Sequence, residues 1–149
     1  MARALLIACN RAESPYAVYP LGLTLVAEAA RARGHKVGEW DCQTLGRHRA
    51  EAGSYRAERD GLAAGHYYGE LDEVLERVTP QVVGLSLRDL DHGDGSSAGG
   101  AGAFVRDSVA LVAEIRRHGE YTVVLGGAGY SLFPEELFRA IGAYYGGVG

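Results

Sequence analysis

The sequence predicts an α/β domain built on an open, doubly wound, five-stranded parallel sheet with helices on both of its faces. Short apolar runs, typical of buried parallel strands, alternate along the chain with segments whose apolar residues recur at helical spacing. Such strand–helix alternation favours one parallel sheet over a bundle or a sandwich. The 149 residues suit a single domain that buries a substantial core.

The first strand–helix–strand unit ends at Asp41. Arg3–Ala8 is an apolar run that predicts the first strand, and the irregular residues 10–20 follow it. A helix begins near Leu21 and ends before Gly34, which supplies a left-handed C-cap. Lys36–Asp41 is the predicted second strand. The expected inward face of the helix consists of Leu21, Leu25, Val26, Ala29 and Ala30.

The middle of the chain holds a polar stretch, a helix, a strand and a glycine-rich loop. Residues 42–69 show no steady period and are predicted to be an insertion or a long connection. From Glu70 a helical pattern returns and ends at Pro80. Residues 81–87 are the predicted third strand, and residues 88–102 are too rich in glycine to favour regular structure.

The last third of the chain predicts two further helices and two further strands. Residues 104–118 are an amphipathic helix whose expected inward residues are Val105, Val109, Val112 and Ile115. The fourth strand is expected at 121–125, a turn at 126–132 and a helix at 133–141. A fifth strand begins within residues 143–148, and no closing helix follows it. We therefore expect the chain to be part of a longer protein.

The irregular segments 10–20, 88–102 and 126–131 each follow a predicted strand. In open parallel sheets, ligands bind outside the carboxyl ends of the strands, so these segments predict a ligand site at one edge. Gly126 and Gly127 fit either a ligand that approaches the sheet edge or a tight turn with positive φ. The hydroxyl of Ser86, in a buried strand, needs a partner, either backbone or ligand.

Several function classes are excluded by composition and motifs. A net charge of −4 lacks the basic footprint of a nucleic-acid binder, and no apolar run is long enough to span a membrane. The single lysine, Lys36, is not in a phosphate-binding loop, and neither a dinucleotide fingerprint nor a nucleophile elbow is present. Cys9 and Cys42 cannot form a disulfide framework, which favours a reducing, cytoplasmic setting. No histidine pairs with another histidine or a cysteine at metal-ligand spacing, and His118 is interpreted as a structural helix-end residue.

A set of short motifs, taken in order, resembles the N-terminal cobalamin (B12)-binding domain of cobalamin-dependent radical S-adenosylmethionine (SAM) enzymes. The motifs are residues 19–23 (Tyr-Pro-Leu-Gly-Leu), 33–37 (Arg-Gly-His-Lys-Val), 80–88 (Pro-Gln-Val-Val-Gly-Leu-Ser-Leu-Arg), 123–127 (Val-Val-Leu-Gly-Gly), 133–136 (Phe-Pro-Glu-Glu) and 147–149 (Gly-Val-Gly). The resemblance covers nearly the whole chain apart from residues 42–69. It implies a Rossmann-like (flavodoxin-like) fold and a single cobalamin-binding domain over residues 1–149.

The resemblance implies cobalamin as the cofactor. Relatives of the family carry Asp-x-His-x-x-Gly after the first strand, but no histidine lies between Met1 and Gly34. Cobalamin is therefore expected base-off, without a protein histidine on the cobalt, its tail entering near Ser86 and Gly126–Gly127. No residue is assigned a catalytic or metal-ligating role. The implied cofactor-binding residues are Asn10, Tyr19, Pro20, Leu21, Gly22, Ser86, Leu87, Arg88, Asp89, Gly126, Gly127, Ala128 and Gly129.

One departure from the family concerns the radical chemistry. The Cys-x3-Cys-x-x-Cys motif that holds the iron–sulfur cluster is absent, so the cluster, SAM and the radical SAM domain are expected in a missing domain or a partner subunit. The expected function is a cobalamin-binding module of a methyltransferase-type enzyme. Two alternatives remain open: a degenerate domain that has lost the cofactor and acts as a scaffold, and half of a nucleotide-sugar transferase, which also shows Gly-His-x-Val after its first helix.

Overall fold

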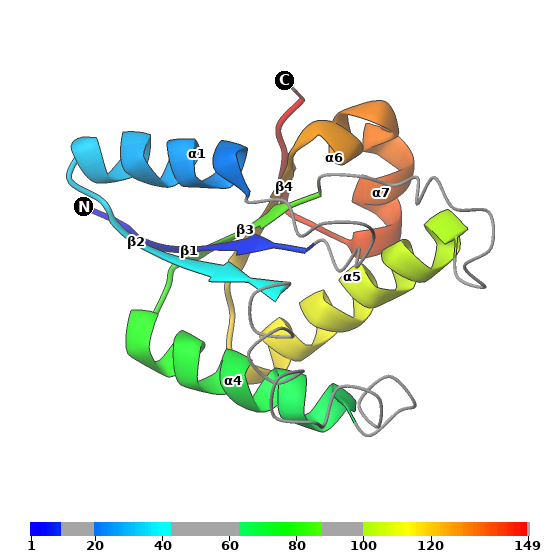
Figure 1. The fold of residues 1–149 in the computed structure, drawn as a ribbon, viewed down its shortest axis with the longest axis horizontal. Coiled ribbons are helices and arrows are strands. Elements are labelled where there is room, and N and C mark those ends of the chain that lie inside the picture. Colours follow the sequence, from blue (N-terminus) through cyan, green and yellow to red (C-terminus); the bar gives the residue numbers. More distant parts are fainter. Residues whose placement is uncertain (10–19, 43–62, 88–99, 149) are drawn as a thin grey trace.

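The protein folds around one parallel sheet. The computed structural model describes residues 1–9, 20–42, 63–87 and 100–148. Its five strands, all parallel, are ordered β2-β1-β3-β4-β5, which confirms the predicted fold class (Figure 1). The strands are β1 (Arg3–Ala8), β2 (Lys36–Asp41), β3 (Val82–Ser86), β4 (Thr122–Gly126) and β5 (Tyr145–Gly146).

Helices lie on both faces of the sheet. Helix α1 covers one face, and α4 and α5 pack side by side against the other (Figure 1). Two shorter helices, α6 and α7, follow β4 and lead to β5. The described helices are α1 (Leu21–Ala32), α4 (Ala63–Val78), α5 (Gly100–His118), α6 (Ala128–Leu132) and α7 (Pro134–Ile141). Among the described residues, none of these helices is both long enough and apolar enough to cross a membrane.

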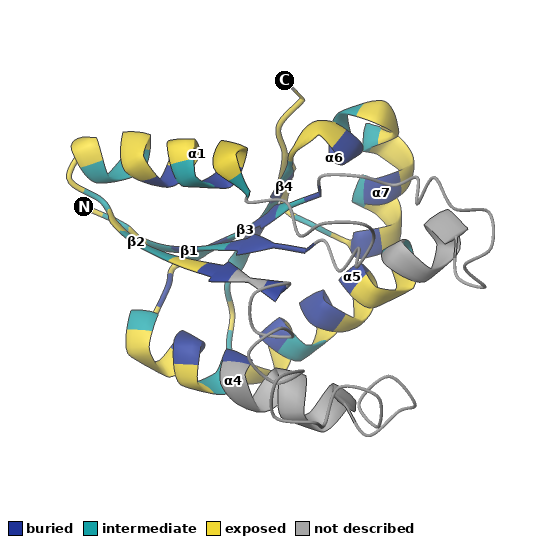
Figure 2. Ribbon diagram, in the orientation of Figure 1, coloured by how far each residue is buried: buried dark blue, intermediate teal, exposed yellow. Residues whose placement is uncertain are grey.

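The main core lies between the sheet and the α4–α5 layer (Figure 2). Alternate residues of a strand point to opposite faces, and those that point toward α4 and α5 are almost fully buried. They pack against apolar residues such as Leu71 of α4 and Ile115 of α5. The buried strand residues, each at most 2 % exposed, are Leu5, Ile7, Val83, Leu85, Val123 and Leu125.

The described residues cover the opposite face of the sheet only in part. Helix α1 packs over β1 and β2, and its buried residues are Leu23 and Ala27. Of the strand residues that point to this side, Leu6, Gly84 and Val124 are half-buried, and Ala8 is buried (6 % exposed). Parallel sheets are normally covered on both faces. Because several residues on this side are only half-buried, this side leaves more room beside the strands than the α4–α5 side does.

The inward face predicted for α1 is wrong. Leu21, Leu25 and Val26 are each at least 60 % exposed, and the buried pair lies on the other side of the helix. Apolar residues surround most of α1, so periodicity alone does not select a face. The choice is made by polar contacts with β2: Thr24 Oγ1 donates to Glu39 Oε2 (3.0 Å), and Arg31 pairs with Glu39 (2.8 Å).

Arg31 ties α1 to the neighbouring strand. Its guanidinium also donates to the carbonyl oxygen of Val37 in β2 (2.8 Å) and pairs with Glu28 one turn earlier. Glu28 and then Glu39 raise the pKa of Arg31 above its already high ordinary value, so the side chain stays charged.

Other boundaries differ from the sequence expectation. Helix α4 begins at Ala63, so the end of the expected 42–69 connection is helical, and α5 begins at Gly100 inside the expected loop. Part of the expected turn at 126–132 forms α6. Val109 of α5 was expected to face inward but is 38 % exposed. The buried face of this helix includes Ser108 and the residues three and four positions after it, and Val109 lies at the margin of that face.

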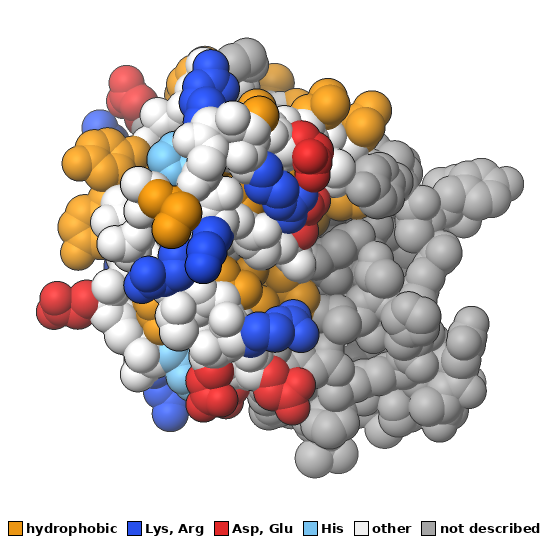
Figure 3. Space-filling model, turned by 90° about the vertical axis from the view of Figure 1, so that its left-hand side faces the viewer, with side chains coloured by type: hydrophobic (Ala, Val, Ile, Leu, Met, Phe, Trp, Pro, Cys, Tyr) orange, Lys and Arg blue, Asp and Glu red, His pale blue; other side chains and the backbone are white. Residues whose placement is uncertain are grey.

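Charges are mixed on the surface at the amino ends of the strands. Figure 3 shows basic and acidic side chains interspersed over the described part of this face, with apolar side chains between them. No patch of a single sign forms in the described part of this view.

Candidate functional site

The carboxyl ends of the three central strands bring small residues together. Ala8 of β1 is in register with Ser86 of β3, which is in register with Gly126 of β4. All three alternate with the core-facing residues, so they lie on the α1 face of the sheet. We call Ala8, Ser86 and Gly126 the small-residue row. The row leaves a strip of sheet edge without bulky side chains.

Ser86 brings a hydroxyl group to the middle of this row. The residue is half-buried, and its backbone carbonyl accepts a hydrogen bond from Cys9 N (3.2 Å). In the described part of the chain its hydroxyl has no hydrogen-bond partner. Of the two partners expected from the sequence, a backbone group is thus not present, and the hydroxyl is available to a ligand.

The two glycines at the end of β4 differ in what they do. Gly127 has φ +97° and ψ 166°, and a Cβ on it would lie 2.5 Å from the carbonyl oxygen of Leu87. This glycine is needed for the turn itself. A Cβ on Gly126 would have no neighbour closer than Gly147 O at 3.9 Å, so Gly126 opens space on the α1 face.

The backbone after β3 fixes this turn. Leu87 N donates to Gly126 O (2.8 Å), and Gly129 N donates to Leu87 O (2.8 Å). The side chain of Leu87 is fully buried in the core and Gly129 is buried as well, whereas Ala128 is exposed at the start of α6. Leu87 and Gly129 therefore support the edge through their backbones, and Ala128 borders it.

The first turn of α1 lies at the same edge, because α1 runs antiparallel to the strands it connects. Leu21 is exposed, and a Cβ on Gly22 would meet nothing within 4 Å. Pro20 precedes the helix and provides no side-chain cap, although its carbonyl accepts a hydrogen bond from Thr24 N (3.1 Å). Uncapped N–H groups at a helix N-terminus favour an anionic ligand group.

The structure thus places Ser86, Leu87, Gly126, Gly127, Ala128 and Gly129 at one edge of the sheet, with Pro20, Leu21 and Gly22 at the first turn of α1. Asn10, Tyr19, Arg88 and Asp89 lie outside the described residues. So does His92, the histidine that the sequence places in the expected loop 88–102 at the ligand edge. Ala8 was missed from the sequence, although alternation supplies the signal: if Leu5 and Ile7 face the core, Ala8 faces the other side.

No family model and no curated protein matches the chain. Among solved structures it is similar to the radical S-adenosylmethionine methyltransferase TsrM from Kitasatospora setae with cobalamin and a [4Fe-4S] cluster bound, at 26% identity and a TM-score of 0.73 over 98% of this chain. A second TsrM structure, with tryptophan substrate and the SAM analogue aza-SAM bound, matches at 25% identity and a TM-score of 0.72 over 96% of this chain.

The chain spans 22% of the length of TsrM in both matches. The likeness nevertheless extends over 98% of this chain. The resemblance to cobalamin-dependent radical SAM enzymes that the sequence indicates is thereby confirmed in the three-dimensional structure.

Proposed function

We propose that this chain is a cobalamin-binding module that works with a radical SAM methyltransferase domain. The observation that carries the proposal is its likeness, over 98% of the chain, to TsrM, whose structure contains cobalamin. The residues at the carboxyl edge fit this cofactor, because the small-residue row is open at Gly126 and includes the hydroxyl of Ser86, which has no partner among the described residues.

Three groups would hold the cofactor. The row of Ala8, Ser86 and Gly126 leaves room for the flat dimethylbenzimidazole tail, and the Ser86 hydroxyl would hydrogen-bond to it. The N-terminal amides of α1 at Leu21 and Gly22 would face the phosphate of the tail. When bound, cobalamin supplies a cobalt that carries a methyl group, and the protein holds and orients it.

We further propose that cobalamin binds base-off and without a protein histidine on the cobalt. The histidines whose side chains the structure describes, His35 and His118, both lie at the amino ends of the strands, since each directly precedes the connection to a strand. His35 Nδ1 also accepts a hydrogen bond from Ala2 N (3.1 Å). Neither is placed to reach the carboxyl edge.

The ligand question has a spectroscopic test. A nitrogen on Co(II) splits its electron paramagnetic resonance lines into three, because 14N has nuclear spin 1. We expect the Co(II) form of the loaded protein to lack this splitting and His92→Ala to leave the spectrum unchanged. A splitting that disappears in His92→Ala would identify His92 as a ligand, and one that persists would indicate that the base of the cofactor stays bound.

The radical chemistry requires a partner domain or subunit. Cys9 and Cys42 are the two cysteines of the chain, are both buried, and are too few for a cluster of three cysteine ligands. We therefore propose that the iron–sulfur cluster and SAM reside in a radical SAM domain or subunit that this module serves. Two buried cysteines, neither of them in a disulfide, fit a reducing compartment such as the cytoplasm.

Titration of the purified chain with hydroxocobalamin tests the main proposal. We expect saturable one-to-one binding. The readout is the change of the corrin absorbance to the base-off spectrum. Absence of binding would support a scaffold domain that has lost the cofactor. A parallel titration with a nucleotide-sugar, for which we expect no binding, tests the transferase alternative.

A further inference from the structure

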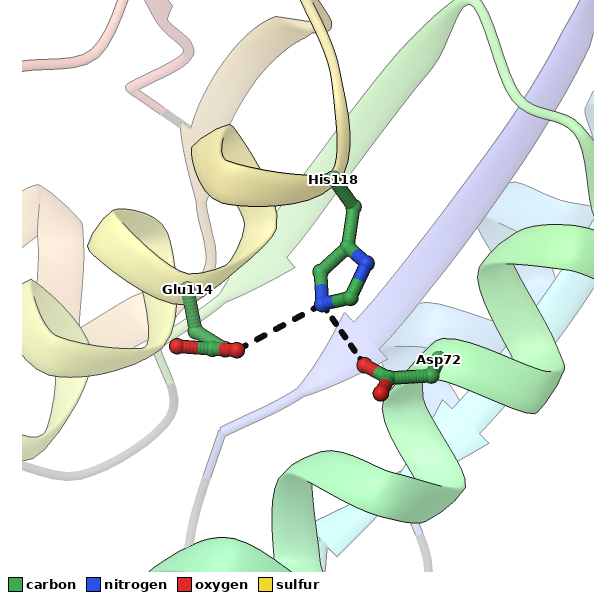
Figure 4. Close-up of side chains that lie close together, drawn as sticks. All are labelled: Asp72, Glu114 and His118. Atoms are coloured by element: carbon green, nitrogen blue, oxygen red, sulfur yellow. Dashed lines mark ion pairs between the residues drawn. The ribbon is translucent and has the colours of Figure 1, made fainter.

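Three metal-ligating side chains converge between α4 and α5, on the face of the sheet opposite to α1 (Figure 4). His118 Nε2 lies 2.6 Å from Asp72 Oδ1 and 3.4 Å from Glu114 Oε1. One donor atom from each residue lies within 4.8 Å of the other two. We call Asp72, Glu114 and His118 the interhelix cluster.

The fold holds this cluster from two elements. Glu114 and His118 are one turn apart on α5, so their side chains project from the same side of the helix. Asp72 reaches them from α4, which packs against α5. His118 is the last residue of α5 and β4 starts at Thr122, so the cluster lies toward the amino ends of the strands. None of its members belongs to the carboxyl edge.

A hydrogen-bonded ion pair does not satisfy all three groups. Two carboxylate oxygens face Nε2 of His118, and this nitrogen carries at most one proton. Asp72 Oδ1 is sealed from solvent, yet despite its short distance to the ring it accepts no well-oriented hydrogen bond in the described part of the chain. Arg117, which is 77 % exposed, pairs with the other oxygen of Glu114 (3.0 Å), and this leaves Oε1 directed at His118.

We propose that the interhelix cluster binds a divalent cation of the zinc class. One imidazole nitrogen and two carboxylate oxygens are ligands that Zn²⁺ takes at about 2.0–2.2 Å. Tetrahedral coordination at these bond lengths separates the ligand atoms by about 3.3–3.6 Å. The 3.4 Å between His118 Nε2 and Glu114 Oε1 already matches this separation. The 2.6 Å between His118 Nε2 and Asp72 Oδ1 is a hydrogen-bond distance, so Asp72 would have to move back by about 0.7–1.0 Å to admit the ion. Because the three side chains are partly exposed, water would take the fourth position.

Bound metal would act as a structural link between α4 and α5. The ion would take the place of the one proton that His118 Nε2 can share with the two carboxylates. Its double positive charge would compensate both carboxylates at once. Because a metal that binds only the folded state stabilises it, the site would raise the thermal stability of the domain.

Zinc titration of the metal-free chain, by isothermal calorimetry and by thermal unfolding, tests the site. We expect one-to-one binding with a Kd of about 10 µM or tighter. At a zinc concentration 100 times Kd, the Tm should rise by about 5–10 °C. Glu114→Gln and His118→Gln should each weaken binding at least tenfold. Glu120→Gln removes an exposed carboxylate just beyond α5 and serves as the matched control, which should bind like wild type.

The outcomes separate a metal site from an ion pair. The proposal would be overturned if zinc does not bind. It would also be overturned if zinc binds both cluster variants as tightly as wild type, because the metal would then sit elsewhere, for example on Cys9 or Cys42. If His118→Gln does not fold, as judged by circular dichroism, Glu114→Gln and Asp72→Asn decide the question. Variants that lower the Tm equally with and without zinc would identify the cluster as an ion pair only.

Discussion

Substitution of the two glycines after β4 should give opposite results, although they are neighbours in the sequence. Gly127→Ala should destabilise the fold, whereas Gly126→Ala should leave the fold intact. The difference follows from the surroundings of each Cβ position: at Gly127 it meets the Leu87 backbone, and at Gly126 it meets open space.

The magnitude at Gly127 has two sources. At φ +97° and ψ 166° the backbone lies in a region that is essentially reserved for glycine, and a side chain there costs about 1–3 kcal/mol. A Cβ would also lie 2.5 Å from Leu87 O and 3.0 Å from Leu87 N, which are backbone atoms that cannot swing away. Moving Leu87 would disturb its hydrogen bonds to Gly126 and Gly129. We expect a total loss of about 3 kcal/mol or more for Gly127→Ala, and less than about 1 kcal/mol for Gly126→Ala.

Urea unfolding of both variants measures the difference, and a cobalamin titration of Gly126→Val then tests the ligand site. Gly126→Val should fold but bind cobalamin at least tenfold more weakly, because its methyl groups would fill the space beside Ser86. Equal unfolding midpoints for Gly127→Ala and Gly126→Ala would refute the structural assignment of Gly127. Unchanged affinity in Gly126→Val would move the ligand away from the small-residue row.

Three further substitutions test the packing of the fold and the edge. Arg31→Ala should lower the free energy of unfolding by only about 1 kcal/mol, because the ion pair of Arg31 with Glu39 is partly exposed. A double-mutant cycle with Glu39→Gln that gives no coupling energy would contradict the link between α1 and β2. Ser86→Ala should bind cobalamin about tenfold more weakly with little change in the urea midpoint, and an unchanged Kd would exclude its hydroxyl from the site. Gly146→Ala should lower the urea midpoint, because a Cβ there would overlap the buried ring of Tyr130, and a wild-type midpoint would show that this contact is loose.

The strands could be predicted almost to the residue because their signal is local. Arg3–Ala8 and Lys36–Asp41 form strands with the predicted bounds, and β3 and β4 differ by one residue at each end. The orientation of α1 could not be predicted in this way. This orientation depends on the contacts of Thr24 and Arg31 with Glu39. Helical periodicity carries no information about such contacts between two elements.

The site was predictable as an edge, but not in its detail. Strand order in a parallel sheet places the segments after β1, β3 and β4 together, so the sequence identifies the location. Which glycine serves the turn depends on where the backbone of Leu87 passes, forty residues earlier in the chain. The interhelix cluster was not predicted either: Glu114 and His118 have helical i, i+4 spacing, but Asp72 joins them only through the packing of α4 on α5.

The two faces of the sheet differ in how they can accept a ligand, and this leads to a last prediction. On the α4–α5 side, residues such as Leu5 and Val123 are fully buried, and a ligand ring there would have to displace core side chains at a cost of about 2–5 kcal/mol each. On the α1 side, the small-residue row is open at Gly126. The interhelix cluster lies on the closed side and toward the opposite ends of the strands, so no shared side chain connects it with the row. Zinc and cobalamin should therefore bind independently. Saturating zinc should raise the Tm while changing the Kd for cobalamin by less than about twofold, and a tenfold change would reveal coupling through the sheet that this arrangement does not provide.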